Sequence, residues 1–330
     1  MSQVLLAHGG GGEAMHALLK DVFLAKLGSP ACLEDAAVLK LGPNPAFTTD
    51  AFVVSPLFFK GGDIGKLAVA GTVNDLSVMG ARPRYLAASF ILEEGLEIGL
   101  LERIVRSMAL EAKASGVHVA AGDTKVVQKG AADRLFIVTT GVGEVIYPGL
   151  SASSVQPGDA ILITGTAGDH GAAILAERGE FGLEVGIQSD AASLWGLLEP
   201  LYQSGLTLHA LRDPTRGGVS ATLNEWAGAS GIAIELDEAA IPVDSSALGL
   251  CELLGLEPLE LASEGRALIA LPQKEAKAAL CVLQEHPLGK NAAQIGVALA
   301  SSSPKVLVRT GYGSKRLLDP PFGEHLPRIC

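Results

Sequence analysis

The last residue of the chain is a cysteine, and its position makes it the first candidate for chemistry. Cys330 ends a segment, 319–330, that holds three prolines and a glycine in twelve residues, so a regular helix is excluded there. We expect an extended, mobile tail, which from Gly323 onward spans at most about 25 to 29 Å. A thiol on such an arm reaches a cleft of its own chain or a site on a partner. We therefore interpret Cys330 as a candidate carrier, with a chance terminal residue as the alternative.

Acidic residues recur in small-residue surroundings along the chain. Each one alone is typical of a helix cap or a turn. Together they indicate magnesium, which proteins hold with a few carboxylates while phosphate oxygens complete the coordination. The sequence thus favours ATP binding in an acidic protein. The motifs are Glu34-Asp35, Thr49-Asp50, Asn74-Asp75, Gly122-Asp123-Thr124 and Arg212-Asp213-Pro214-Thr215-Arg216.

A run of four glycines follows His8 and precedes a helix expected near Glu13. Glycines at such a place let backbone N–H groups approach a phosphate. The run lacks the Lys-Ser/Thr ending of a Walker motif, so a flexible N-terminal loop remains the alternative. No Gly-x-Gly-x-x-Gly follows a strand, so the sequence gives no support for a dinucleotide cofactor.

Composition and charge limit the possible partners. The 330 residues carry a net charge of −11 and no Lys/Arg run, which argues against a nucleic-acid or anionic membrane surface. The remaining cysteines are widely spaced, so neither a zinc site nor a disulfide framework is expected. Cys251 and Cys281 lie in apolar helical runs and are expected in the core, whereas the role of Cys32 stays open. Without a signal peptide pattern, a cytoplasmic location is expected.

Short strand-like runs alternate with longer helical ones, which predicts an α/β or α+β fold of two domains. Pro148, Gly149, Pro157 and Gly158 cluster between the two halves and mark the boundary. We expect a glycine-rich segment 1–45, a first domain 46–147, a second domain 148–318 and the tail 319–330. Expected helices are 64–80, 97–115, 169–178, 189–204, 216–230, 244–255 and 273–286; expected strands are 47–54, 85–92, 135–142, 160–164, 232–236, 266–271 and 306–308.

These motifs together resemble the HypE family of hydrogenase maturation factors, which are carbamoyl dehydratases. The resemblance covers essentially the whole chain. The aspartate motifs are shared with a wider superfamily that includes aminoimidazole ribonucleotide synthetase, selenophosphate synthetase and thiamine-phosphate kinase. The specific signal is the terminal Pro327-Arg328-Ile329-Cys330.

The resemblance implies two α/β domains, a homodimer formed through the first domain, and ATP in a cleft between the domains. It also implies that the carrier cysteine receives a carbamoyl group from the partner HypF. The enzyme then uses ATP to dehydrate the S-carboxamide to a thiocyanate, and the cyanide passes to iron on a HypC–HypD complex. ATP and Mg²⁺ are the implied cofactors.

By analogy with the superfamily, ATP and metal contacts are expected from nine residues. Asp35, Asp50, Asp75, Asp123 and Asp213 are the metal and phosphate ligands, joined by Asn74, Thr124, Thr215 and Arg216. The family pattern further points to Glu264 as a general base and to Lys125 as a group that orients substrate or stabilises charge, and it leaves the reverse assignment open. One departure is Glu34 beside Asp35, where superfamily members often show two aspartates.

Two other classes compete with this interpretation. A small-molecule kinase or selenophosphate synthetase of the superfamily would not need Cys330, and the second would need a reactive cysteine near the N-terminal glycines, where none occurs. A non-catalytic scaffold would keep a degenerate ATP site and a tail that only docks.

Overall fold

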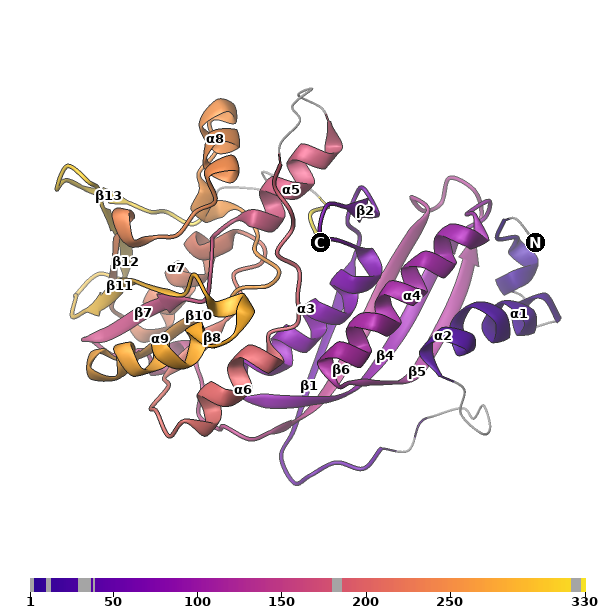
Figure 1. The fold of residues 1–330 in the computed structure, drawn as a ribbon, viewed down its shortest axis with the longest axis horizontal. Coiled ribbons are helices and arrows are strands. Elements are labelled where there is room, and N and C mark those ends of the chain that lie inside the picture. The colour runs from indigo at the N-terminus through magenta and orange to yellow at the C-terminus, as the bar shows by residue number, and fades with distance from the viewer. Residues whose placement is uncertain (1–2, 10–12, 29–36, 38, 180–185, 322–327) are drawn as a thin grey trace.

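The structure, a computed structural model, describes residues 3–9, 13–28, 37, 39–179, 186–321 and 328–330. Two mixed helix and strand domains lie side by side, with the C-terminal end of the chain between them (Figure 1). The expected fold class is thereby confirmed. Among the described residues, no helix combines the length and apolarity needed to cross a bilayer.

The first domain is built on a four-stranded sheet in the order β1-β6-β4-β5. Among its described strands, only β4 and β5 run parallel. Helices α3 and α4 pack on each other, and α3 packs on the sheet. The bounds are α1 Glu13–Leu18, a π-helical turn Leu19–Leu24, α2 Ala25–Leu27, β1 Pro45–Phe52, β2 Phe58–Phe59, β3 Gly62–Asp63, α3 Ile64–Val78, β4 Ala81–Glu93, α4 Ile98–Ser115, β5 His118–Val127 and β6 Leu135–Val145.

The second domain contains a seven-stranded sheet in the order β13-β12-β9-β11-β7-β10-β8. Its only parallel pair among the described strands is β9 with β12. The bounds are β7 Asp159–Ile163, α5 Asp169–Arg178, α6 Trp195–Gln203, β8 Ala210–Arg212, α7 Gly218–Ser230, β9 Ala233–Asp237, α8 Ser245–Leu254, β10 Leu268–Pro272, α9 Ala276–Gln284, β11 Ala293–Leu299, β12 Lys305–Arg309 and β13 Lys315–Leu317.

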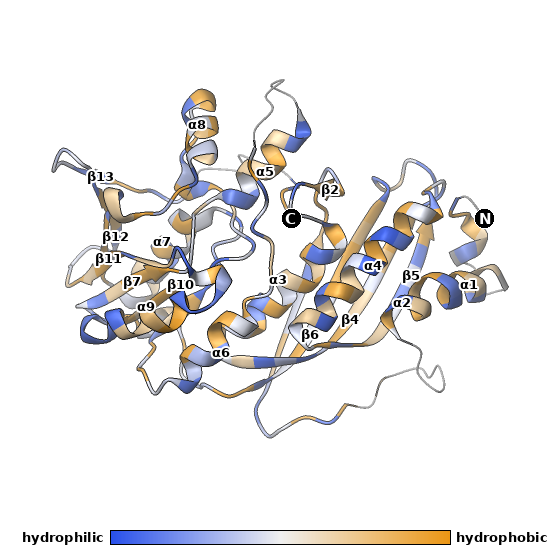
Figure 2. Cartoon of the chain, in the orientation of Figure 1, coloured by the Kyte–Doolittle hydropathy of each residue, from blue (hydrophilic) through white to orange (hydrophobic). Residues whose placement is uncertain are grey.

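Helix α3 joins the two domains. Asp63 caps it by accepting hydrogen bonds from the N–H groups of Gly65 and Lys66. The helix is buried on nearly all sides and mostly apolar or neutral in colour (Figure 2), as expected for a helix enclosed by other elements. One side faces the sheet, and the other accepts a hydrogen bond at the Ser77 carbonyl from the Tyr202 hydroxyl of α6.

Most expected elements are present, and three expectations are wrong. The stretch expected as a helix from 189 begins only at Trp195, because the backbone before it is held outside the helix by cross-domain contacts, among them Leu194 N–H to Asn74 Oδ1 at 2.8 Å. Asp123 was expected at a turn but lies inside β5. Cys281 is exposed, although Cys251 is buried as expected.

Candidate active site

Three of the sequence-predicted carboxylates approach one another where the two domains meet. Asp50 lies in β1, Asp75 lies in α3, and Asp213 follows β8. The Thr48 hydroxyl donates to Asp75 Oδ2 at 2.7 Å and so holds that carboxylate beside β1. Burial, followed by repulsion from Asp75, raises the pKa of Asp213 to about 7.

The same crowding affects the other two carboxylates. Burial raises the pKa of Asp50, and nearby Arg216 opposes the rise. Burial also raises the pKa of Asp75, with repulsion from Asp50 adding to it. Clustered carboxylates with raised pKa values are a place where added positive charge is favourable. Asp50, Asp75 and Asp213 therefore have the donor chemistry for a magnesium ion bound together with phosphate oxygens.

The loop that carries Asp213 needs two consecutive glycines. Gly217 and Gly218 have φ values of 75° and 59°, and Gly218 starts α7. A Cβ on Gly218 would lie 2.5 Å from the carbonyl oxygens of Leu259 and Leu261, so the loop approaches that segment with backbone alone. The sequence-predicted Thr215 and Arg216 belong to this loop and lie beside Asp213.

Glu264 is the most deeply buried acid next to this cluster, with 2% of its surface exposed. Burial raises its pKa well above the ordinary value, and repulsion from Asp213 and Asp190 adds to the effect. Its Oε1 atom has no hydrogen-bond partner among the described residues. The backbone is fixed on both sides, since its N–H donates to Asp190 Oδ1 at 3.0 Å and its carbonyl accepts from Asn74 Nδ2 at 3.0 Å.

Asn74 is therefore a link between the domains and also a neighbour of the acidic cluster. Its Nδ2 donates to the Glu264 and Ala192 carbonyls, and its Oδ1 accepts from Leu194. Because Asn74 precedes Asp75 on α3, the same helical turn carries one carboxylate of the cluster and the clamp on Glu264.

The C-terminal residues lie against the end of β1. Cys330 accepts a hydrogen bond at its carbonyl from Val53 N–H at 2.9 Å, and Arg328 accepts one from Ser55 N–H at 3.2 Å. Ile329 is buried in the core. The tail thus pairs with residues 53–55 in the antiparallel sense, three residues after Asp50.

The residue that binds the terminal cysteine follows one that lies near Glu264. A Cβ on Gly71 would lie 2.9 Å from the Phe52 ring and 3.9 Å from Glu264 Oε2, so the Phe52 ring and the Glu264 carboxyl flank the same point of α3. Phe52 is directly followed by Val53, which binds Cys330. The tail thus docks on the residue that follows Phe52, whose ring lies near Glu264.

Not every predicted residue joins this region. Asp123 and Lys125 form an exposed ion pair at 3.6 Å on β5, and Thr124 is buried beside them. Strand β5 is three strands from β1, or about 14 Å along the sheet. Within one chain, these three residues therefore lie apart from Asp50 and Glu264, and their assignment to the site stays a prediction.

Other expectations fall outside the described residues, namely Asp35, Cys32 and the glycines 10–12. Within the described ranges, no group of three His, Cys, Asp or Glu side chains is arranged as a ready metal site. A metal ion at the cluster would therefore need phosphate oxygens to complete its coordination.

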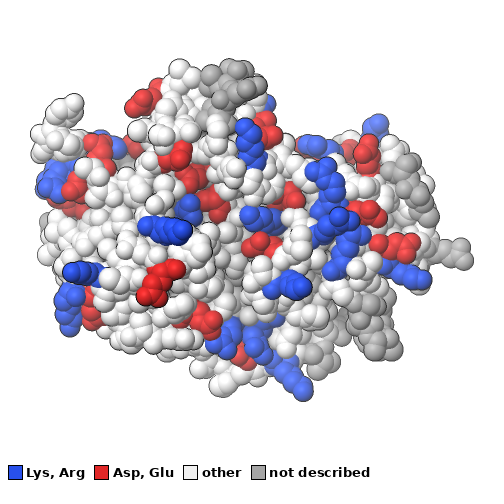
Figure 3. Space-filling view, viewed as in Figure 1, with Lys and Arg blue, Asp and Glu red and all other residues white. Residues whose placement is uncertain are grey.

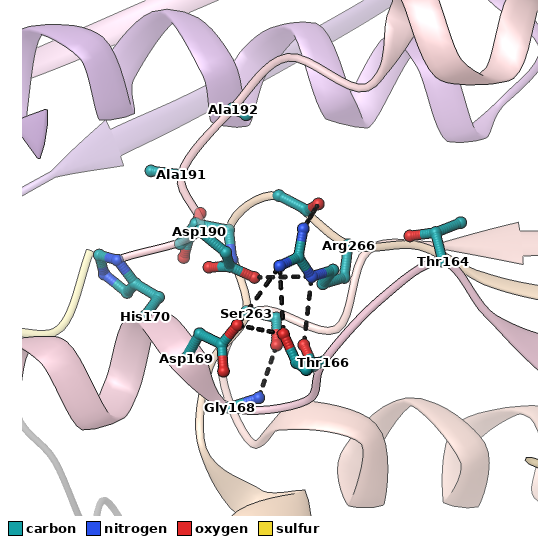
Figure 4. Close-up of polar contacts among 12 residues, drawn as sticks. Thr164, Thr166, Gly168, Asp169, His170, Asp190, Ala191, Ala192, Ser263 and Arg266 are labelled. Atoms are coloured by element: carbon teal, nitrogen blue, oxygen red, sulfur yellow. Dashed lines mark hydrogen bonds and ion pairs between the residues drawn. The ribbon is translucent and has the colours of Figure 1, made fainter. Parts of the chain in front are cut away.

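Sequence reasoning missed a buried ion network behind Glu264. Arg266 lies between Asp169 and Asp190, at 3.3 Å and 3.6 Å (Figure 4). Burial raises the pKa of Asp169 to about 6. Burial also raises the pKa of Asp190, and the charge of Arg266 opposes that rise. The sequence signal for this network is Gly168-Asp169-His170-Gly171, in which an aspartate and a histidine stand between two glycines at the start of a helix.

Comparisons with known proteins agree with this geometry. Residues 33–145 match the family described as AIR synthase related protein, N-terminal domain, and residues 156–309 match its C-terminal domain. The carbamoyl dehydratase HypE of Rhodobacter capsulatus is 49% identical, over 99% of this chain and 98% of that protein. That of Escherichia coli K12 is 48% identical over the full length of both.

Solved structures give the same result. A crystal structure of the hydrogenase maturation protein HypE in complex with ATP has a TM-score of 0.95 at 48% identity, covering 99% of each chain. HypE in a HypE–HypF complex has a TM-score of 0.81 at 47% identity, covering 86% of this chain and 93% of that one. A thiamine monophosphate kinase from Aquifex aeolicus shares the fold at 19% identity, with a TM-score of 0.63 over 87% and 93% of the two chains. The chain belongs to the HypE carbamoyl dehydratase family, within the AIR synthase related proteins.

Proposed function

We propose that this chain dehydrates an S-carboxamide on Cys330 to a thiocyanate, with ATP as the co-substrate, and so supplies the cyanide ligand of a [NiFe]-hydrogenase iron. The observation that carries the proposal is the docking of the described tail against Val53, next to the region that holds Glu264 and the acidic cluster. A small-molecule kinase has no use for a terminal thiol at this place.

The chemistry explains why ATP is needed. The amide oxygen of R–S–C(=O)NH₂ leaves carbon poorly, so it first takes the γ-phosphoryl group of ATP. The nitrogen then loses its two protons as the C≡N bond forms and the C–O bond breaks. The products are R–S–C≡N, ADP, phosphate and a proton, and the oxygen of the released water equivalent ends in phosphate.

The acidic cluster suits the ATP end of this reaction. A relative at 48% identity has been solved with ATP, which supports ATP binding by this chain. We infer that Asp50, Asp75 and Asp213 bind magnesium together with the phosphates, with Asp35 and Asp123 as the further candidates. The metal would neutralise charge on the transferred phosphoryl group. Asn74, Thr124, Thr215 and Arg216 are the remaining proposed nucleotide contacts.

Glu264 suits the proton-transfer end. Burial raises its pKa, which makes its carboxylate a stronger base than an exposed glutamate, and a base works best with a pKa near the working pH. Its Oε1 has no partner among the residues that the structure describes and is available to a substrate amide. We therefore favour Glu264 as the proton acceptor and Cys330 as the carrier.

Lys125 requires a different explanation, because it lies on the outer strand β5 of its own chain. We propose that it acts through a homodimer, in which a second copy approaches along β5. The strand pairs only with β4 among the described strands and its residues 121–123 are exposed, so it offers an open sheet edge. In that arrangement Lys125 would orient substrate or stabilise charge.

The partners follow from the same reasoning. A relative at 47% identity forms a complex with HypF, so we propose HypF as the carbamoyl donor. A HypC–HypD complex is the proposed cyanide acceptor, and the cytoplasm the proposed location. On the visible face, acidic and basic side chains are interspersed over most of the surface, and basic ones gather over α4 (Figure 3).

The test uses the full chain with HypF, carbamoyl phosphate and ATP-magnesium. We expect a carbamoyl adduct on the C-terminal peptide that loses one water for each ADP released, as measured by mass spectrometry. Cys330→Ser is the matched control and should form no thiocyanate. ATP turnover by Cys330→Ser at the wild-type rate would contradict the proposal and favour a free small-molecule substrate, and an adduct that never dehydrates would favour a scaffold.

A further inference from the structure

Two adjacent residue pairs face each other behind the docked tail. Asp169 and His170 lie in the first turn of α5, and Ser189 and Asp190 lie in the extended segment before α6. His170 is turned toward the C-terminal segment, whereas Asp169 and Asp190 face Arg266 (Figure 4). Each pair therefore has one residue on the tail side and one on the side of the Glu264 loop.

On the tail side, His170 is completely buried and binds the tail backbone. Its Nε2 atom lies 2.7 Å from the Ile329 carbonyl oxygen, and its Nδ1 atom lies 2.8 Å from Ser189 Oγ. A carbonyl only accepts, so Nε2 carries the hydrogen. The Ser189 hydroxyl then donates to Nδ1 and accepts from Ala191 N–H at 3.1 Å. Every polar atom of this receptor has its partner when the tail is present.

The imidazole suits this task because it stays neutral. Burial lowers the pKa of His170 to about 4, so at neutral pH the ring keeps one N–H and one lone pair. The edge of the Phe59 ring packs against it with the ring centroids 5.4 Å apart, which limits its rotation. The bond to Ile329 thus sets the position of the residue next to Cys330.

On the loop side, Asp190 holds the backbone of Glu264. Asp190 Oδ1 accepts from Glu264 N–H at 3.0 Å, and Arg266 Nε lies 3.6 Å from Asp190 Oδ2. Arg266 also donates to the Gly265 carbonyl at 3.1 Å. A Cβ on Gly265 would lie 1.9 Å from the Asp190 carbonyl oxygen, so the two backbones are in direct contact.

We propose that His170 and Asp190 are paired positioning residues, which fix the carrier cysteine and the carboxylate of Glu264 relative to each other. His170 with Ser189 is the receptor for the Ile329 carbonyl, and Asp190 with Arg266 fixes the loop of Glu264. Because Ser189 and Asp190 are consecutive, movement of either partner is transmitted through one peptide unit. The proposal rests on the proposed function, since it assigns these residues to the same site.

The first test compares two neutral replacements of His170 by the alkylation rate of Cys330. The amide nitrogen of Gln occupies nearly the place of Nε2, whereas that of Asn occupies nearly the place of Nδ1, so only His170→Gln keeps a donor for Ile329. Cys330 of each full-length variant is alkylated with iodoacetamide and quantified on the C-terminal peptide by mass spectrometry. Loss of one neutral hydrogen bond should make His170→Asn react about five-fold faster than wild type, with His170→Gln close to wild type.

Equal rates for His170→Asn and wild type would overturn the tail receptor. The Tm of both variants is measured alongside, and Ser189→Ala serves as an independent variant that keeps His170. Ser189→Ala should also raise the alkylation rate, because Nδ1 loses the hydroxyl that orients the ring. An unchanged rate in both His170→Asn and Ser189→Ala would count against the proposal even if one of them were unstable.

The second test concerns Asp190. Its replacement by Asn keeps an oxygen for the Glu264 N–H, whereas replacement by Leu removes it. We expect single-turnover dehydration of the carbamoylated chain to slow in Asp190→Leu at unchanged KM for ATP, with substantial recovery in Asp190→Asn. Equal loss in both variants, or a change confined to KM, would contradict the positioning role.

The alkylation measurement needs neither ATP nor the carbamoyl donor, so the two proposals fail separately. A wild-type ATP turnover rate in Cys330→Ser with the expected alkylation pattern would refute the dehydratase reaction alone. Normal dehydration with an unchanged alkylation pattern would refute the receptor alone.

Discussion

Replacing Glu264 by Gln should remove activity and at the same time stabilise the protein. The substitution preserves shape and eliminates a charge that is buried beside Asp213 and Asp190. Proton transfer by a positioned side chain contributes about 10²- to 10⁴-fold, so the dehydration rate should fall by a factor in that range. Glutamine keeps a polar atom at the place of Oε1, so the gain comes from loss of the charge. Burying a charged group whose Oε1 has no partner among the described residues costs at least about 1 to 3 kcal/mol. The free energy of unfolding should rise by a similar amount at neutral pH.

The pH dependence gives the sign of this effect. The folded-state pKa of Glu264 is raised, so the unfolded chain loses its proton first as pH increases. Stability of the wild type must therefore fall between the ordinary glutamate pKa and the raised one. Below pH 4.5 both states hold the proton, and the curves for wild type and Glu264→Gln should converge.

Thermal unfolding monitored by circular dichroism at pH 4, 7 and 8.5 tests this expectation. A gain of 1 kcal/mol corresponds to roughly 2 to 4 °C in Tm for domains of this size. Glu252→Gln on the exposed side of α8 is the matched control and should leave Tm nearly unchanged. A Glu264→Gln protein with an unchanged or lower Tm at pH 8.5, or with wild-type dehydration, would refute the reasoning.

Three further outcomes are expected. Gly265→Ala places a Cβ 1.9 Å from the Asp190 carbonyl, so dehydration should be lost while ATP binding by calorimetry persists; normal dehydration would contradict the close approach. Arg328→Ala removes an ion pair of 2.5 Å with Asp133, so the alkylation rate of Cys330 should rise up to about five-fold at low salt and less at high salt. A salt-independent alkylation rate would argue against the ion pair. The pKa of His170 is about 4 in the folded protein and 6.5 for a free histidine, so the free energy of unfolding should decline by about 3 kcal/mol as pH falls from 6.5 to 4. The same decline in His170→Gln would disprove this origin of the pH dependence.

The sequence was most informative where pattern and packing agree. The apolar run from Ile64 predicted a buried helix, and α3 is indeed buried on nearly all sides. The motifs around Asp50, Asp75 and Asp213 predicted one acidic site, since each contains carboxylates next to small residues. Their meeting depends on α3 lying between β1 and the second domain, which no local pattern reveals.

The features that the sequence did not predict depend on tertiary contacts. Residues 189–194 have helical character in sequence but form no helix, because Asn74 of the other domain binds their backbone. Lys125 was grouped with Glu264 by family pattern, yet the strand order places β5 at the far edge of the sheet. The contact of His170 with Ile329 joins residues 159 positions apart, and only the folded chain brings them together.

In the proposed reaction, ATP removes the amide oxygen of a carbamoyl group carried by Cys330. The most direct measurement carries a heavy-oxygen label in that group through a single turnover and follows it by mass spectrometry. We expect the label to appear in inorganic phosphate as the C-terminal peptide loses one water. Label that stays on the peptide, or is released as water while ATP is hydrolysed, would contradict it.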